Sequence, residues 1–281
     1  MTTVAVTGAS GQLGRLVADR LLASTDPASV VLLSRDPSRL ASYAEQGAQV
    51  READFDRPET LPAAFAGVDR LLLISTDVIG ARVAGQVAAI EAAKAAGVGH
   101  IAYTSVPEPV PANPAGVVPD HAATEEALRA SGVAWTMLRN NLYADMQDGV
   151  LAQGAATGTI VTNAGEGATA YVTRADCAAV AVGVLLGEGH EGRAYDVTGP
   201  RAWTAADLAA LAAERSGRAV EVVTVDDEAY TAGLVGAGVP DVIAPLLTSF
   251  GAAARGGYLA TVTDVVAEVG GVTPTPLEAA I

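Results

Sequence analysis

The chain of 281 residues has only one cysteine, Cys177. A single cysteine excludes an intrachain disulfide and any zinc site that is built from several cysteines. Cys177 lies in an apolar stretch that is typical of a helix. We therefore expect a buried structural thiol rather than a nucleophile.

Lysine is almost absent as well, because Lys94 is the only lysine among the 17 basic residues. Any mechanism that needs a catalytic lysine would have to use it. Lys94 falls in the last turn of a predicted helix, just before Gly97, where a cation stabilises the negative end of the helix dipole. The sequence thus excludes lysine Schiff-base chemistry and a phosphate-binding loop of the kind that requires a lysine.

No stretch of about 18 apolar residues predicts a membrane span. No basic segment precedes the first apolar residues, as a signal peptide would require, so we expect a cytoplasmic protein. The formal net charge is −15 and basic runs are missing, which argues against a nucleic-acid-binding surface. We expect a small-molecule partner, no nucleic acid and no membrane, and a homodimer stays open.

The first 22 residues carry the most informative pattern. A short apolar strand, Val4 to Val6, runs into a glycine-rich turn, and a helix with apolar residues at Val17 and Leu21 follows. Glycines let the backbone approach a pyrophosphate, and the helix N-terminus offers it free N–H groups and a positive dipole end. The glycine spacing predicts a dinucleotide site, with an ordinary strand–turn–helix as the alternative. The predicted cofactor-binding residues are Thr7, Gly8, Ser10, Gly11, Gln12, Leu13 and Gly14.

The residues after the second predicted strand bear on the choice between NADH and NADPH. Arg35 lies about 20 residues after the glycine loop, where an acid binds the ribose of NAD and an arginine suits the 2′-phosphate of NADP. Arg35 and Arg39 could clasp such a phosphate together. Asp36 could instead accept a hydrogen bond from the ribose, or it could cap a helix that has Pro37 as its first residue. The pattern favours NADPH, and NADH stays open.

Two further predicted strands end in residues that fit a dinucleotide. Asp54 and Phe55 follow the third strand, where the adenine amino group and ring would lie. A loop-capping acid and a core aromatic are an equal alternative for this pair. Ser75 ends the fourth strand, beside the expected central phosphates and ribose. We therefore predict Asp54, Phe55 and Ser75 as cofactor-binding residues.

Short apolar runs alternate with helical patterns along the first half of the chain. This predicts a parallel sheet that is covered by helices on both faces. The crossovers then give a Rossmann doubly wound α/β fold, with ligands at the carboxyl ends of the strands. The expected strands are Thr3–Thr7, Val30–Ser34, Ala48–Ala53, Arg70–Ser75, His100–Ser105 and Ala134–Arg139. The expected helices cover 12–23, 37–46, 58–66, 80–96 and 120–131.

The regular alternation stops after Asn141. Thr204 and Asp207 have the spacing of a helix-capping pair. Further strands are expected at Tyr171–Thr173, Arg193–Thr198 and Ala219–Val225, with a helix over 175–187. The domains we expect are an NAD(P)-binding Rossmann domain formed by 1–141 and 171–198, and a smaller, α-rich substrate-binding lobe formed by 142–170 and 199–281.

Five motifs spread along the chain occur together. They are Thr7-Gly-Ala-Ser-Gly-Gln-Leu-Gly14, Ser34-Arg-Asp-Pro37, Asp69-Arg-Leu-Leu-Leu-Ile-Ser75, Ala102-Tyr-Thr-Ser105 and Leu138-Arg-Asn-Asn-Leu-Tyr143. The combination resembles the NmrA-like branch of the atypical short-chain dehydrogenases/reductases, and within it the NADPH-dependent quinone oxidoreductases. The resemblance covers nearly the whole chain and implies an NAD(P)H-dependent oxidoreductase. A fold and a cofactor site do not determine the reaction, however.

The chain departs from ordinary short-chain reductases, which carry Tyr-x-x-x-Lys on the helix after the fifth strand and a serine at the end of that strand. Ser105 matches the serine, but His121 and Glu125 stand at the tyrosine and lysine positions. Four residues apart, they share one helix face. His121 could donate or relay a proton. The alternative is a histidine at a helix start that pairs with Glu125.

The missing tyrosine–lysine pair bears on the reaction. Hydride reduction of an isolated ketone leaves an alkoxide that needs a strong proton donor, whereas hydride reduction of a quinone leaves a delocalised anion. We therefore expect hydride transfer from NAD(P)H to a quinone or polycyclic aromatic ketone, without flavin or metal. One alternative is a tailoring enzyme, a reductase or oxygenase, that acts on a quinone-type aromatic polyketide. Another is a redox-sensing dinucleotide-binding regulator without turnover.

Asn140, Asn141 and Tyr143 follow the sixth strand, where substrate should meet the nicotinamide. They could orient the substrate, or they could terminate the strand and pack against the lobe. Tyr103 is expected in the core, and His100 and His190 at the surface. The predicted catalytic residues are His121, Ser105, Tyr143 and Asn141.

Overall fold

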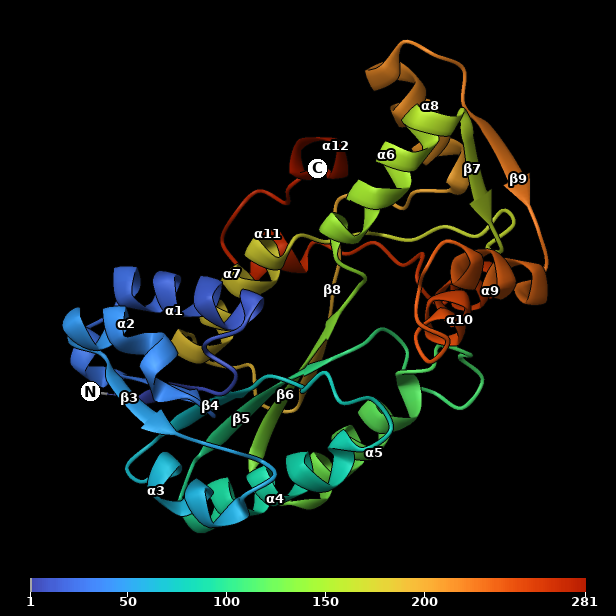
Figure 1. The fold of residues 1–281 in the computed structure, drawn as a ribbon. Coiled ribbons are helices and arrows are strands. Elements are labelled where there is room, and N and C mark those ends of the chain that lie inside the picture. The colour runs from blue at the N-terminus through green and yellow to red at the C-terminus, as the bar shows by residue number, and fades with distance from the viewer. Residues whose placement is uncertain (1) are drawn as a thin grey trace.

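The computed structural model describes residues 2–281 and contains a seven-stranded sheet in the order β3-β2-β1-β4-β5-β6-β8 (Figure 1). Every pairing in this sheet is parallel. The strands are β1 (Val4–Val6), β2 (Val30–Ser34), β3 (Gln49–Glu52), β4 (Arg70–Leu73), β5 (His100–Ser105), β6 (Ala134–Asn140) and β8 (Arg193–Val197). The predicted Rossmann doubly wound α/β fold is confirmed.

Helices cover both faces of this sheet (Figure 1). α1 and α7 pack together on one face, and α3, α4 and α5 lie on the other. The helices are α1 (Gln12–Ser24), α2 (Ala41–Glu45), α3 (Leu61–Phe65), α4 (Arg82–Ala95), α5 (Val118–Ala130) and α7 (Arg174–Leu186), with short 3-10 helices η1 (Pro27–Ser29), η2 (Pro37–Leu40) and η3 (Pro58–Thr60). The helices expected at 37–46 and 58–66 each begin as a 3-10 turn at a proline, which lacks the N–H that a first turn leaves unpaired.

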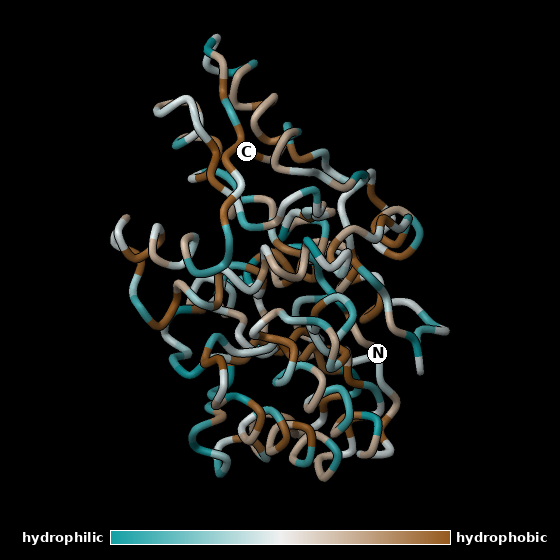
Figure 2. Tube along the Cα trace, turned by 90° about the vertical axis from the view of Figure 1, so that its right-hand side faces the viewer, coloured by the Kyte–Doolittle hydropathy of each residue, from teal (hydrophilic) through white to brown (hydrophobic). Residues whose placement is uncertain are grey.

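The central strands of the sheet are largely apolar because both of their faces are buried, whereas the edge strands β3 and β8 are partly exposed. Successive side chains point to opposite faces. Val4 and Val6 therefore pack with the α1 and α7 side, whereas Ala5 packs with the α3 and α4 side. Figure 2 shows apolar stretches running through the interior of this part of the molecule, with hydrophilic residues at many outer turns. A strand buried on both faces is an apolar run in the sequence, which is why these strands could be predicted.

A second group of elements follows β6 and lies beyond the sheet (Figure 1). Its two strands, β7 (Thr159–Thr162) and β9 (Glu221–Thr224), pair in parallel. Ile160 of β7 packs with Leu151 and Leu208 from two neighbouring helices. The helices here are η4 (Ala144–Gln147), α6 (Asp148–Thr157), α8 (Ala205–Ser216), α9 (Asp227–Gly236), α10 (Ala244–Arg255) and α12 (Leu277–Ala280), whereas α11 (Val265–Glu268) packs against α7 and β8. This group is α-rich, and the capping box of Thr204 and Asp207 at α8 is confirmed.

Some local predictions differ from the structure. The strand expected at Tyr171–Thr173 is wrong, because Val172 forms only an isolated bridge with Tyr143. α6 and β7 were not anticipated, since the Gly-, Ala- and Thr-rich stretch that contains them has no clear periodicity. His100 is buried rather than at the surface, and its Nε2 atom lies 2.8 Å from Thr136 Oγ1. His190 is half-buried.

Other predictions hold. Tyr103 is fully buried in the core, and Cys177 is a buried free thiol whose pKa is raised by burial. Lys94 lies in the last turn of α4, as expected. Among residues 2–281, no helix combines the length and the apolar character that a membrane span requires.

Candidate active site

The glycine loop between β1 and α1 turns where side chains would not fit. Gly8 has a φ of 59°, in the left-handed region that glycine adopts at little cost. A Cβ atom on Gly14 would lie 2.3 Å from the backbone oxygen of Gly8. Glycine at this position therefore lets α1 begin very close to the carboxyl end of β1.

The N-terminus of α1 is free to bind an anion. Its N-cap is Gly11, which offers no side-chain cap, and its first turn carries no acidic residue. The first N–H groups of a helix have no partners within the helix, and they lie at the positive end of its dipole. This arrangement fits the pyrophosphate of a dinucleotide.

A cavity of about 570 Å³ lies along the carboxyl ends of β1, β2, β3 and β4. That volume is in the usual range for a small-molecule site. The predicted cofactor residues that line it are Thr7, Gly8, Ser10, Gly11, Arg35, Arg39, Asp54, Phe55 and Ser75. Gln12, Leu13 and Gly14 are not among its lining residues. The cavity is also lined by Asp36, the alternative ribose ligand, and by residues outside the predicted set, which are Ser34, Ala53, Asp56, Ile74, Thr76, Asp77, Val78, Ala81, Arg82 and Gly85.

The two arginines at one end of the cavity have free guanidinium groups. Arg35 and Arg39 are exposed, and the ion pairs within residues 2–281 include neither. The carboxylate of Asp36 is already engaged, because it accepts from the backbone N–H of Ser38 at 3.1 Å and from its hydroxyl at 2.6 Å. The acid therefore caps η2, as the alternative reading of Asp36-Pro37 predicted. Two free cations and an occupied acid suit a 2′-phosphate better than a 2′-hydroxyl.

Arg15 holds this end of the cavity together, although the sequence did not point to it. Its side chain donates to the backbone oxygen of Ser10 at 3.2 Å and to that of Arg39 at 3.0 Å. The hydroxyl oxygens of Ser10 and Ser34 lie 3.0 Å apart. These contacts connect the glycine loop to the segment after β2.

Asp54 and Phe55 form another part of the cavity wall. Asp54 accepts from the backbone N–H of Asp56 at 3.1 Å and from Arg57 Nε at 3.2 Å, as a loop-capping acid would. Phe55 lies against α4, where a Cβ atom on Gly85 would come within 3.0 Å of the Phe55 Cβ atom. Asp54 therefore reaches the cavity while also organising its own loop.

A buried ion pair fixes the wall that follows β4. Asp120 of α5 accepts from the backbone N–H of Gly80 at 2.7 Å and from Arg82 Nε at 3.1 Å. Arg82 also donates to the backbone oxygen of Thr76 at 2.9 Å. This segment directly follows a predicted strand, and that position was the signal that could have identified its lining residues.

His121 lies on the buried face of α5, and its side chain contacts Tyr103 rather than Glu125. Its Nδ1 atom lies 2.9 Å from the Tyr103 hydroxyl oxygen. Burial, with a smaller effect of Arg82, lowers the pKa of His121 to about 3. The imidazole is therefore neutral near pH 7, and the alternative prediction, a pairing of His121 with Glu125, is wrong.

Glu125 is held in a buried cluster of charges at the ends of β5 and β6. It accepts from Arg139 Nε at 3.0 Å, from Arg129 at 2.5 Å and from the Ser105 hydroxyl at 2.7 Å. Burial alone would raise the pKa of Glu125, but the hydrogen bonds from Arg139 and Ser105 outweigh it and lower the pKa. The two positions on α5 therefore hold a neutral imidazole and an ionised, fully engaged carboxylate.

The residues after β6 are held in different ways. Asn141 donates to the backbone oxygen of Leu259 at 3.0 Å and accepts from the backbone N–H of Leu142 at 2.8 Å. The guanidinium of Arg174 lies over the ring of Tyr143, 4.1 Å from its centroid. Burial raises the pKa of Tyr143. Both ends of the Asn141 amide are thus engaged by backbone.

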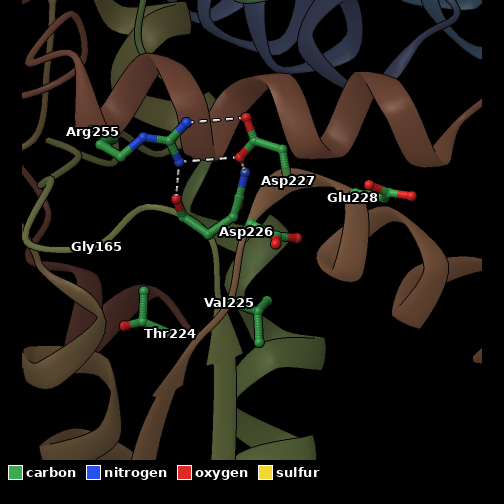
Figure 3. Close-up of a pocket in the computed structure, with 8 residues that line it drawn as sticks. Gly165, Thr224, Val225, Asp226, Asp227, Glu228 and Arg255 are labelled. Carbon is green, nitrogen blue, oxygen red and sulfur yellow. Dashed lines mark hydrogen bonds and ion pairs between the residues drawn. The ribbon is translucent and has the colours of Figure 1, made fainter.

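A second cavity of about 550 Å³ is lined by residues beyond the sheet (Figure 3). Arg255 donates to both carboxylate oxygens of Asp227, at 3.1 and 3.0 Å, and to the backbone oxygen of Asn163. No predicted site residue lines this cavity. Arg255, the one basic residue among its lining residues, is paired with Asp227, so the dinucleotide site is the cavity at the sheet edge.

Comparison with known proteins agrees with this geometry. The profile of a family described as NAD(P)H-binding matches residues 8–188, which include the glycine loop and every lining residue of the cavity except Thr7. This chain belongs to the NAD(P)H-binding, NmrA-like oxidoreductases. A member from Aspergillus flavus, an NmrA-like family domain-containing oxidoreductase, is 30% identical over 280 residues, 96% of this chain and 91% of that protein.

Two bacterial relatives have more specific names. Quinone oxidoreductase 2 of Escherichia coli is 37% identical over 256 residues, which are 91% of this chain and 89% of that protein. The NAD(P)H azoreductase of Xenophilus azovorans is 32% identical over 270 residues, 95% of this chain and 93% of that protein.

Solved structures of the family have the same fold. The NADPH complex of the quinone oxidoreductase from Escherichia coli superposes with a TM-score of 0.94 at 35% identity, covering 99% of this chain and 98% of that one. A triphenylmethane reductase from Citrobacter sp. superposes with a TM-score of 0.89 at 35% identity, covering 98% and 96%. The chain is thus an NAD(P)H-dependent oxidoreductase with NADPH as its cofactor, and the prediction of NADPH is confirmed.

Proposed function

We propose that this protein transfers a hydride from NADPH to a quinone or a similarly electron-poor conjugated aromatic acceptor. The proposal rests on two side chains of α5. At the positions of the tyrosine and lysine of ordinary short-chain reductases, His121 is neutral, and Glu125 is held by Arg129 and Arg139. The site therefore lacks the strong acid that reduction of an isolated ketone requires.

The nature of the acceptor compensates for that lack. Bound NADPH supplies the hydride, and the protein provides orientation and a water-poor environment. A reduced quinone carries its charge on an aromatic oxygen of low basicity, which solvent can protonate. The names of the relatives, a quinone oxidoreductase, an azoreductase and a triphenylmethane reductase, support a conjugated aromatic acceptor here.

The roles of individual residues follow from their positions. Arg35 and Arg39 hold the 2′-phosphate, and the N-terminus of α1 holds the pyrophosphate. Ser105 and Tyr143 lie at the ends of β5 and β6, beside the expected path of the acceptor. We propose that the acceptor enters between this edge of the sheet and the lobe formed by 142–170 and 199–281. A cytoplasmic location and a homodimer stay predictions.

The proposal is tested with NADPH and a panel of acceptors that contains quinones, an azo dye, a triarylmethane dye and an unconjugated ketone. Loss of NADPH absorbance measures turnover, and NADPH fluorescence measures binding separately. We expect turnover with conjugated acceptors and none with the ketone. Tight NADPH binding without turnover of any acceptor would overturn the proposal and favour a redox-sensing binding protein.

A further inference from the structure

The small sheet beyond the main sheet has one open edge. Among residues 2–281, β9 pairs only with β7, and it lies at the outer edge of the lobe (Figure 1). The backbone N–H groups of Glu221 and Val225 donate toward β7. Successive residues of a strand direct their backbone groups to opposite sides, so those of Val222 and Thr224 point to the open edge. We propose that β9 pairs there with β9 of a second copy of this chain, antiparallel and about a two-fold axis.

The opposite edge of this sheet is less open. Thr159 of β7 directs its backbone groups away from β9, and a side chain already engages them. Thr157 Oγ1 accepts from the Thr159 N–H at 3.2 Å and lies 3.1 Å from the Thr159 oxygen. β9, in contrast, carries neither proline nor lysine, the residues that commonly protect an exposed strand edge. β9 is therefore the edge that can accept a further strand.

The charges beside β9 select the register of the pairing. Arg218 precedes the strand and Asp226 follows it. Both are exposed, and the ion pairs within residues 2–281 include neither. Both also lie four residues from the outward-directed Val222. An antiparallel pair centred on Val222 therefore places Arg218 opposite the partner's Asp226, twice in the dimer. Centring the pair on Glu221 instead would place two carboxylates opposite each other.

The second cavity provides a place for the arginine of the partner. Asp226 and Glu228 line it, and within the described chain neither carboxylate forms an ion pair (Figure 3). Its one basic lining residue, Arg255, is engaged by Asp227. Negative charge is thus in excess at the end of β9, where a guanidinium from a second copy would neutralise it. Because this chain carries both halves of the contact, a second copy fits the edge better than a foreign peptide.

The pairing would also extend a sheet that is small on its own. Two strands alone are marginally stable, and the dimer would hold four, in the order β7-β9-β9-β7. The β-branched side chains of Val222, Val223 and Thr224 favour the extended backbone that such pairing needs. None of residues 218–226 lines the dinucleotide cavity, so the inference does not depend on the reaction that the protein catalyses.

Analytical ultracentrifugation of the full chain tests the interface. We expect a dimer whose dissociation constant rises about 10-fold or more in Arg218→Glu, which brings like charges together. Thr224→Pro should be monomeric where the wild type is dimeric, because the ring removes an outward N–H and leaves the pairing with β7 intact. Val161→Pro is the matched control, since it places the same ring on the outer edge of β7. NADPH binding shows that each variant is folded.

Cysteine cross-linking tests the register. The single native thiol, Cys177, is buried and does not interfere. In the proposed register Glu221 lies opposite the partner's Val223, in a close pair without hydrogen bonds that a disulfide can span. A mixture of Glu221→Cys and Val223→Cys proteins, oxidised with glutathione disulfide, should therefore form a covalent heterodimer, whereas neither protein alone should cross-link.

Three results would overturn the inference. The first is a wild type that stays monomeric at concentrations of about 100 µM, where a Kd in the micromolar range gives mostly dimer. The second is a dimer that persists unchanged in both Thr224→Pro and Arg218→Glu, which would place the interface elsewhere. The third is a cysteine mixture that does not cross-link, or Glu221→Cys protein that cross-links with itself.

Discussion

The Nδ1 atom of His121 lies 2.9 Å from the hydroxyl oxygen of Tyr103, and both side chains are buried between α5 and β5. Burial lowers the pKa of His121 to about 3 and raises that of Tyr103 to about 12. The pair is therefore neutral over the whole range in which a reductase operates. It makes the fold sensitive to acid rather than supplying a catalytic acid.

Because of His121, the protein should become less stable as the pH decreases. Its pKa is about 3 in the folded chain and 6.5 in the unfolded chain, so only the unfolded state takes up a proton between these values. The stabilisation is fully present above pH 6.5 and is lost as pH falls toward 3. At pH 5 the loss from this residue is up to ~2 kcal/mol. Urea unfolding of the wild type and of His121→Gln at pH 7 and pH 5 measures it.

The control for this experiment is His190→Gln, because His190 is only half-buried. We expect the His121→Gln variant to lose less stability on acidification than the wild type, and the His190→Gln variant to behave more like the wild type. Equal pH dependence in the wild type and in His121→Gln would refute the account of a buried neutral imidazole.

Glu125→Gln should destabilise the protein strongly. The Glu125 side chain is 1% exposed and is the shared counter-charge of Arg129 and Arg139. Removing one member of a buried ion pair leaves the other charge uncompensated, at a cost of about 3–5 kcal/mol. Glu126→Gln is the matched control, since that side chain is 78% exposed and should change stability by less than about 0.5 kcal/mol. Denaturant midpoints that are equal for the two variants would contradict this.

Arg35→Ala and Arg39→Ala should each weaken NADPH binding while leaving NADH binding nearly unchanged. Each variant would lose a charge-assisted contact worth about 1.5–3 kcal/mol, which corresponds to roughly a 10- to 100-fold rise in the Kd for NADPH. Fluorescence titration with both cofactors measures this, with the exposed Arg193→Ala on β8 as control. The assignment of the 2′-phosphate site fails if NADPH affinity is unchanged in both variants.

Gly14→Ala should abolish tight dinucleotide binding. The added Cβ atom would lie 2.3 Å from the Gly8 oxygen, so α1 or the loop must move away from the cavity. Gly149→Ala is the control, because a Cβ atom there meets nothing within 4 Å, and alanine favours a helix by roughly 1 kcal/mol. Thermal melts with and without NADPH compare the two. Normal NADPH stabilisation of Gly14→Ala would contradict the account of the loop.

The central strands of the main sheet could be predicted because burial on both faces leaves apolar runs such as Val30–Ser34 in the sequence. β7 and α6 could not be predicted, because their register depends on contacts with β9 and α8, far along the chain. Local propensity alone does not contain such contacts.

The cofactor-binding residues could also be predicted from the sequence, because each group of them consists of residues that lie close together in the chain. The hydrogen-bond partners of His121 and Glu125 could not be predicted from the sequence. Tyr103, Ser105 and Arg139 come from neighbouring strands, and burial decides which of them each α5 side chain meets.

The central claim is that this site reduces acceptors that stabilise their own negative charge. The most direct test compares naphthoquinone with 2-tetralone, a ketone of similar size whose carbonyl is not conjugated with the ring, at saturating NADPH. The account predicts a readily measured kcat/KM for naphthoquinone and no detectable turnover of tetralone. Reduction of tetralone at a rate comparable with that of naphthoquinone would contradict it, because an isolated ketone requires the proton donor that α5 lacks.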